Sequence, residues 1–140
     1  MSFIWKCAFF VWLTTITVLS LTPHPPVPTQ GLLGWDKFQH ASAYGVLTFL
    51  GALAFRFYLR SSGGRFLAAA LLAVVLGGLM ELAQAGFTSA RSAELGDLLA
   101  DAVGATVVVG LARMVAALRV GGKWPFRSLA SLVALVCLCW

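Results

Sequence analysis

The sequence predicts an all-α membrane protein, a polytopic bundle of four transmembrane helices followed by a short apolar C-terminal segment. Of the 140 residues, 60% are hydrophobic and only 11% are charged. A soluble domain of this size needs far more charge to cover its surface, so most of the surface is expected to face lipid. Four apolar runs approach the roughly 20 residues that cross a hydrocarbon core of about 30 Å. The length supports one domain, residues 1–140.

The four predicted helices cover residues 3–21, 36–58, 66–86 and 95–118. A secretory signal peptide is the alternative for the first run. That run is long for a signal, and no small-x-small pattern precedes the break at Thr22-Pro23, which favours a retained helix. A proline-rich linker follows through Gln30, and Ser61-Ser62-Gly63-Gly64 is predicted as the turn between the second and third helices. The apolar tail, residues 128–140, is too short to span and is predicted as a half-membrane, interfacial or partly helical segment.

Small residues recur at four-residue spacing in the third and fourth predicted helices. They are Ala69, Ala73 and Gly77 in the third, and Ala100 and Gly104 in the fourth. Such ridges let helix backbones approach closely in lipid, where hydrophobicity gives no drive for association. The alternative, that alanine and glycine are simply common in membrane helices, explains the pattern nearly as well.

The basic residues predict the orientation. Eight of the ten lysines and arginines fall on one side of the predicted bundle, namely Lys6, Arg56, Arg60, Arg65, Arg113, Arg119, Lys123 and Arg127. The positive-inside rule assigns that side to the cytoplasm. Both termini are then cytoplasmic, and the loops at 22–35 and 87–94 face outward. All five acidic residues lie on or near the outer side: Asp36, Glu81, Glu94, Asp97 and Asp101.

Polar residues near that outer side share helix faces. Helical spacing aligns Asp36, Lys37, His40 and Tyr44 in the second helix, Glu81 with Gln84 in the third, and Asp97 with Asp101 and Gly104 in the fourth. A charge at this depth costs about 2.5–3.5 kcal/mol, so Glu81 and Asp101 are expected to face the bundle interior and to pair with Lys37, His40 or Arg91.

A purely structural role is the alternative for this set, because buried ion pairs also fix helix register. That role is preferred for Gln84 and Tyr44 taken singly. For the whole set a functional site is preferred, because leucine would pack well at each position without the cost of a buried charge.

The polar residues match no complete catalytic or metal-binding motif. Two carboxylates and a histidine suffice for general acid–base chemistry, but Ser42 and Ser92 stand in no recognised nucleophile context. The composition allows a metal site of His40 with Glu81 and Asp97. No helix carries a ligand pair like that of HExxH, however, so neither a metal nor another cofactor is predicted.

The sequence also argues against nucleic acid as a partner and against a disulfide framework or a cysteine zinc site. The basic residues lie between apolar runs and form no patch on a soluble face, which excludes nucleic acid as a partner. Cys7, Cys137 and Cys139 are odd in number and lie in apolar stretches without spaced partners. They are predicted to be small buried hydrophobes.

The ordered motifs resemble the VanZ-like family of small bacterial membrane proteins. The resemblance rests on Asp36-Lys37-x-x-His40-x-x-x-Tyr44, Glu81-x-x-Gln84, Arg91 and Asp97-x-x-x-Asp101-x-x-Gly104, and it extends from the first helix to about Leu118. Two positions depart from it: Ala41 stands where the family usually has an aromatic residue, and Asp101 where it usually has asparagine. The resemblance implies a multi-pass protein of the bacterial cytoplasmic membrane. The founding member is associated with teicoplanin resistance, and no defined catalytic activity is attached to the family.

Two functions therefore follow as hypotheses. The first is a non-enzymatic envelope protein whose outer-leaflet polar site binds a lipid, glycolipid or cell-wall-related head group and affects glycopeptide susceptibility. The second is a membrane-embedded enzyme that acts on an envelope lipid through Glu81, His40 and Asp97. The lack of a nucleophile or metal motif favours binding over catalysis.

Overall fold

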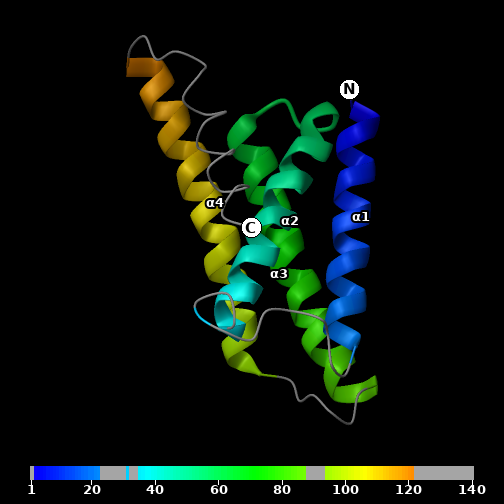
Figure 1. Cartoon of the computed structure of the whole chain (residues 1–140). Coiled ribbons are helices and arrows are strands. Elements are labelled where there is room, and N and C mark those ends of the chain that lie inside the picture. Colours follow the sequence, from blue (N-terminus) through cyan, green and yellow to red (C-terminus); the bar gives the residue numbers. More distant parts are fainter. Residues whose placement is uncertain (1, 23–30, 32–34, 88–93, 122–140) are drawn as a thin grey trace.

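The computed structural model describes residues 2–22, 31, 35–87 and 94–121 (Figure 1). In this part of the chain the regular structure is entirely helical. Its elements are α1 (Ser2–Leu21), α2 (Asp36–Ala54), the 3₁₀-helix η2 (Phe55–Phe57), α3 (Ser62–Phe87) and α4 (Leu95–Gly121). The four α-helices run side by side, and each reverses the direction of the one before it (Figure 1). The predicted tail at 128–140 lies outside the described residues.

The turn predicted at residues 61–64 is wrong for three of its four residues, because α3 begins at Ser62 and includes Gly63 and Gly64. The hydroxyl oxygen of Ser61 accepts a hydrogen bond from the backbone N–H of Gly64 at 3.3 Å. A serine in this position satisfies one of the free N–H groups of the first turn and stabilises the helix start. The two glycines therefore continue the helix, and α3 starts four residues before the predicted position.

The second helix begins at Asp36 as predicted but ends earlier, since α2 stops at Ala54 and the next three residues form η2. Three helices among the described residues are long and apolar enough to cross a membrane: Phe3–Leu21, Ser62–Phe87 and Leu95–Arg119. The polar residues at the start of α2 leave an apolar portion at 41–54, about 21 Å of helix at 1.5 Å per residue. The structure thus confirms the all-helical class and three candidate spans.

Helix α2 lies at the centre of the packing and contacts α1, α3 and α4. Its side chains Leu47 and Thr48 are almost fully buried, and the Thr48 hydroxyl donates a hydrogen bond to the carbonyl oxygen of Tyr44 at 2.8 Å. The indole N–H of Trp12 in α1 donates to the carbonyl oxygen of Ala43 at 2.9 Å. A helix enclosed on several sides faces less lipid than its neighbours, which explains why α2 tolerates lower hydrophobicity.

The small residues singled out from the sequence lie buried, among them Ala69 and Ala73 on α3 and Gly104 on α4. Helices α2 and α4 approach closely where the backbone of Gly104 lies against the carbonyl group of Ala41. A Cβ atom on Gly104 would collide with that carbonyl, and one on Gly45 would lie 3.4 Å from the carbonyl oxygen of Gly104. Close contact of these two helices therefore requires glycine at position 104.

The outer surface of the bundle carries large apolar side chains, such as Phe10 on α1, Leu82 on α3 and Val103 on α4, each more than half exposed. Such a surface fits lipid contact. Cys7 also lies exposed on α1, so the prediction that it is buried is wrong. An apolar helix in lipid presents hydrophobic residues outward as well as inward, and composition alone does not separate the two faces.

Replacement of Gly104 by alanine is expected to destabilise the bundle, because the added methyl group meets the backbone of α2. Overpacking of this kind costs about 1–3 kcal/mol. Gly110, on the same helix, has open space around its Cα, so Gly110→Ala is the matched control and should leave stability equal or slightly raised. Melting temperatures in detergent measure both; equal temperatures for the two variants would contradict the close α2–α4 contact.

Candidate functional site

The antiparallel course of the helices brings the starts of α2 and α4 to the same end of the bundle as the end of α3 (Figure 1). All five acidic residues of the chain lie at this end, together with Lys37 and His40. We call this group the polar cluster; it consists of Asp36, Lys37, His40, Glu81, Glu94, Asp97 and Asp101. The described basic residues other than Lys37 lie in the turns and helix ends toward the opposite end.

Lys37 joins α2 to the start of α4. Its ammonium group donates hydrogen bonds to Oδ1 of Asp97 and to Oε2 of Glu94, the latter at 2.8 Å, and lies 3.5 Å from Oδ2 of Asp36. The hydrogen bonds to Asp97 and Glu94 raise the pKa of the Lys37 amine above its ordinary value. Lys37 is therefore a cation that neutralises part of a carboxylate-rich surface.

His40 lies between two carboxylates of α4, one turn of helix apart. Its Nδ1 atom is 3.0 Å from Oδ1 of Asp101, and its Nε2 atom is 3.6 Å from Oδ2 of Asp97. The side chains of Asp97 and His40 are only 10% and 12% exposed. An ionised Asp101 accepts a hydrogen bond from Nδ1–H, which leaves Nε2 as the free nitrogen of a neutral imidazole. Asp97 is thus shared between Lys37 and His40.

Asp101 is the most deeply buried of the acidic residues, at 1% exposure. Its Oδ2 atom has no hydrogen-bond partner within the described part of the chain. This oxygen lies against Gly77 of α3, where any Cβ atom would overlap it. The carboxylate therefore fits only because position 77 is glycine, and it places negative charge directly behind the imidazole.

Glu81 is buried at 6% exposure, and its Oε2 atom accepts a hydrogen bond from the backbone N–H of Glu94 at 2.7 Å. Glu81 therefore faces the bundle interior, as expected, and lies beside the start of α4. Its expected cationic partner is not observed among the described residues; the backbone N–H takes that role. A carboxylate at the start of a helix also interacts favourably with the helix dipole, which explains this position.

The remaining predicted residues are arranged differently. The Gln84 side-chain amide donates to the carbonyl oxygen of Ser20 at 3.0 Å and so links α3 to the end of α1. Tyr44 is buried, one turn below His40, with its ring parallel to the imidazole. Arg91 lies outside the described residues. These contacts fit the structural role that the sequence favoured for Gln84 and Tyr44.

Sequence reasoning left two participants out of the site. Glu94 was counted among the acidic residues but not among the site residues, although its side chain binds Lys37 and its backbone N–H binds Glu81. Its position directly before the first residue of α4 is the signal that could have identified it, because free N–H groups there attract carboxylates. Ser20 accepts the hydrogen bond from Gln84 through its backbone oxygen, and the sequence holds no signal for such a backbone contact.

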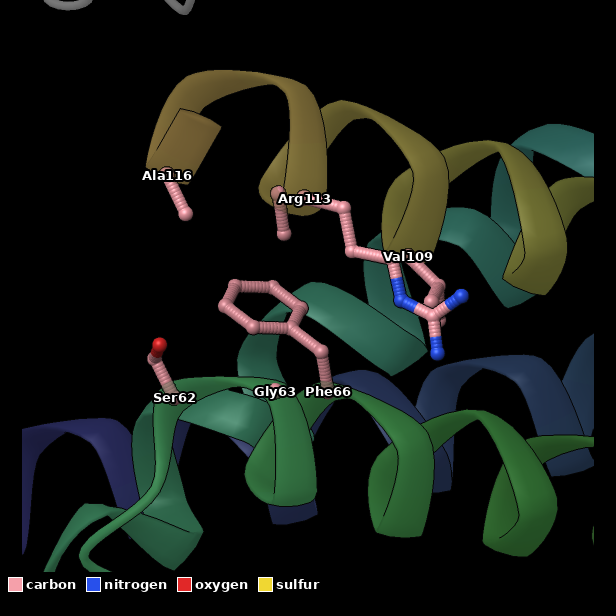
Figure 2. A pocket seen from close by; sticks show the side chains of 7 residues that line it. Ser62, Gly63, Phe66, Val109, Arg113 and Ala116 are labelled. Carbon is pink, nitrogen blue, oxygen red and sulfur yellow. The ribbon is translucent and has the colours of Figure 1, made fainter. Parts of the chain in front are cut away.

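A hollow of about 50 Å³ lies between the first turns of α3 and the second half of α4, toward the other end of the bundle (Figure 2). Phe66 projects between the two helices there, and Arg113 is the one charged residue of its lining. A mostly apolar hollow with one cation and no partner group for chemistry is a weaker candidate than the polar cluster.

The polar cluster offers two kinds of chemistry. Its carboxylates accept hydrogen bonds from ammonium and hydroxyl groups, and its histidine between two carboxylates is suited to proton transfer. Asp36, His40 and Asp97 each supply one ligand atom, all within 4.8 Å of one another, so these three residues could hold a metal ion. The trio differs from the one considered from the sequence, since Asp36 replaces Glu81.

The fold and the cluster define the class: an all-helical membrane protein with a charged cluster at one end of its bundle. No family model, no curated protein and no solved structure compared with the chain matches it. Function therefore has to be argued from the cluster.

Proposed function

We propose that the protein is a non-enzymatic, VanZ-like component of the bacterial cell envelope whose polar cluster binds the head group of a lipid, glycolipid or cell-wall-related molecule. One observation carries the proposal. All five carboxylates of a strongly apolar chain gather at one end of the bundle, where Lys37 and His40 are the only described groups able to carry positive charge against them.

The excess of carboxylates determines the kind of ligand. Asp36 and Glu94 have side chains more than half exposed, so they are reachable from the membrane surface. Carboxylates accept strong hydrogen bonds from ammonium groups and from sugar hydroxyls. Head groups that carry amines or sugars offer such donors at the depth where α2, α3 and α4 meet.

The proposed topology has four spans, with α2 crossing in the interior of the bundle and its polar first turns at the interface. The basic end faces the cytoplasm by the positive-inside rule. Both termini are then cytoplasmic, and the polar cluster lies in the outer leaflet of the cytoplasmic membrane. The resemblance to the VanZ-like family is consistent with a multi-pass membrane protein and suggests an effect on teicoplanin susceptibility.

A membrane-embedded enzyme is the second candidate, and the placement of His40 favours it. An imidazole 3.0 Å from one buried carboxylate and 3.6 Å from another is positioned to accept and release a proton. Binding remains the preferred function, since the described part of the cluster holds no serine, cysteine or threonine nucleophile.

The topology is tested by single cysteines in a background in which the three native cysteines are replaced by serine. Cysteines at Thr29 and Ser89 are expected to react with an impermeant maleimide added to intact cells, and those at Ser62 and Gly122 only after permeabilisation. Reaction of the Ser62 position in intact cells would reverse the orientation and remove the basis for an outer-leaflet site.

The binding function is tested with Glu94→Gln, which removes one exposed carboxylate while Lys37 keeps its contact with Asp97. Folding should persist, because an exposed ion pair contributes only about 0–1 kcal/mol. Loss of a charge-assisted hydrogen bond of about 1.5–3 kcal/mol should weaken lipid retention roughly tenfold to a hundredfold. Native mass spectrometry of protein released from nanodiscs of bacterial total lipid extract measures retention.

The control is Arg113→Gln, which removes a charge toward the other end of the bundle and should leave lipid retention unchanged. Teicoplanin susceptibility of cells that express each variant at equal abundance gives a second readout, expected to follow retention. Equal retention by Glu94→Gln and Arg113→Gln would contradict head-group binding at the polar cluster.

A further inference from the structure

We propose that Asp36, His40 and Asp97 form a binding site for a divalent metal ion such as Zn²⁺ or Co²⁺. The proposal concerns the protein alone and does not depend on a lipid ligand. It names a cofactor that the sequence did not predict.

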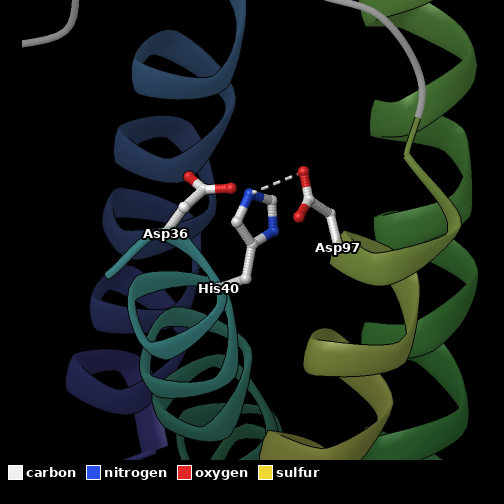
Figure 3. Close-up of side chains that lie close together, drawn as sticks. All are labelled: Asp36, His40 and Asp97. Carbon is white, nitrogen blue, oxygen red and sulfur yellow. Dashed lines mark ion pairs between the residues drawn. The ribbon is translucent and has the colours of Figure 1, made fainter. Parts of the chain in front are cut away.

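The three ligand atoms converge from two helices. Asp36 and His40 are four residues apart and therefore lie on one face of α2, one turn from each other. Figure 3 shows the imidazole between the carboxylates of Asp36 and Asp97, the latter reaching across from α4. Three protein ligands with positions left open for water or another ligand is the arrangement of many zinc sites that bind exogenous molecules.

The spacing between His40 and Asp97 fits two ligands of one ion. The distance from Nε2 to Oδ2 is 3.6 Å, which is long for a hydrogen bond. Zinc lies about 2.0–2.2 Å from nitrogen and oxygen ligands, so two ligands at a tetrahedral angle are separated by roughly 3.4 Å. The observed gap is close to that separation.

The far side of the imidazole carries the partner that metal-bound histidines need. Nδ1 of His40 lies 3.0 Å from Oδ1 of Asp101, and a carboxylate in this place fixes the ring orientation and the tautomer that turns Nε2 toward the metal. The second oxygen of Asp101 is buried at 1% exposure of the residue and lacks a partner among the described residues. That second oxygen lies against Gly77 of α3, which holds the carboxylate in place behind the imidazole and keeps its first oxygen on Nδ1.

Lys37 is the competitor for this position. Its ammonium group binds Asp97 and lies 3.5 Å from Asp36, so in the metal-free protein it neutralises two of the three ligands. Its flexible stem and its second partner, the exposed Glu94 at 2.8 Å, allow it to release Asp97 while it stays paired. Metal binding then exchanges one cation for another between the same carboxylates.

The imidazole selects the class of metal. Magnesium and calcium prefer oxygen ligands and larger ligand sets, whereas imidazole suits zinc, cobalt and similar ions. The site should therefore bind Zn²⁺ and its spectroscopic substitute Co²⁺ in preference to Mg²⁺.

The test uses the full chain in detergent, purified with a histidine-free tag, stripped with a chelator, and with its three cysteines replaced by serine so that thiols do not bind the probe. Co²⁺ titration followed by visible absorption, and Zn²⁺ titration followed by calorimetry, should give one site per chain. His40→Ala and Asp97→Asn should each weaken binding at least tenfold, and Asp101→Asn about 10–100-fold. Lys37→Met should tighten it by removing the competing ammonium.

His24→Ala is the matched control, because it removes the other histidine of the chain and should leave affinity unchanged. Failure of the wild type to bind Co²⁺ or Zn²⁺ would overturn the proposal, as would equal losses for His24→Ala and His40→Ala. Displacement of bound Co²⁺ by an equal concentration of Mg²⁺ would also overturn it. If His40→Ala does not fold, Lys37→Met still decides: weaker or unchanged affinity contradicts the assigned ligands. No lipid is added, so these outcomes are independent of the head-group test.

Discussion

The contact between the carboxylate of Asp97 and two basic side chains of α2 is the interaction on which the arrangement depends. Asp97 is nearly buried, and it meets Lys37 on one side and His40 on the other. Removal of a charge from water is costly unless it is paired, so Asp97 can lie inside the bundle only where α2 brings basic side chains to it. This explains why the polar start of α2 lies against the start of α4, and why the lower hydrophobicity of α2 is tolerated.

That electrostatic contact and the glycine packing support each other. His40 and Asp101 approach to 3.0 Å because α2 and α4 touch backbone to backbone beside them, at Ala41, the next residue of α2, and Gly104, one turn further along α4. Gly77 of α3 then leaves room for the second oxygen of Asp101. The same packing leaves the polar cluster with more carboxylates than cations. Both the proposed head-group site and the proposed metal site use that excess.

The sequence predicted the features that depend on local composition and spacing. The length of the apolar runs predicted the helices. The four-residue spacing predicted that Asp36 shares a helix face with His40, and Asp97 with Asp101. Features that depend on contacts between helices were not predictable in the same way. The backbone partner of Glu81, the meeting of Asp36 with Asp97 and the outward position of Cys7 follow from helix rotation, which periodicity constrains only loosely. The early start of α3 depends on a single capping hydroxyl at Ser61. The sequence did not reveal it, because Gly63 and Gly64 indicated a turn instead.

The central claim is that basic side chains of α2 hold the carboxylates of α4 inside the bundle. It is tested most directly by a double-mutant cycle on the most buried of these pairs, His40 and Asp101. The free energy of unfolding in mixed micelles would be measured for the wild type, His40→Gln, Asp101→Asn and the double variant. A coupling energy above about 1 kcal/mol is predicted, because the two groups are buried and in direct contact. Additive effects, within about 0.5 kcal/mol, would contradict the account.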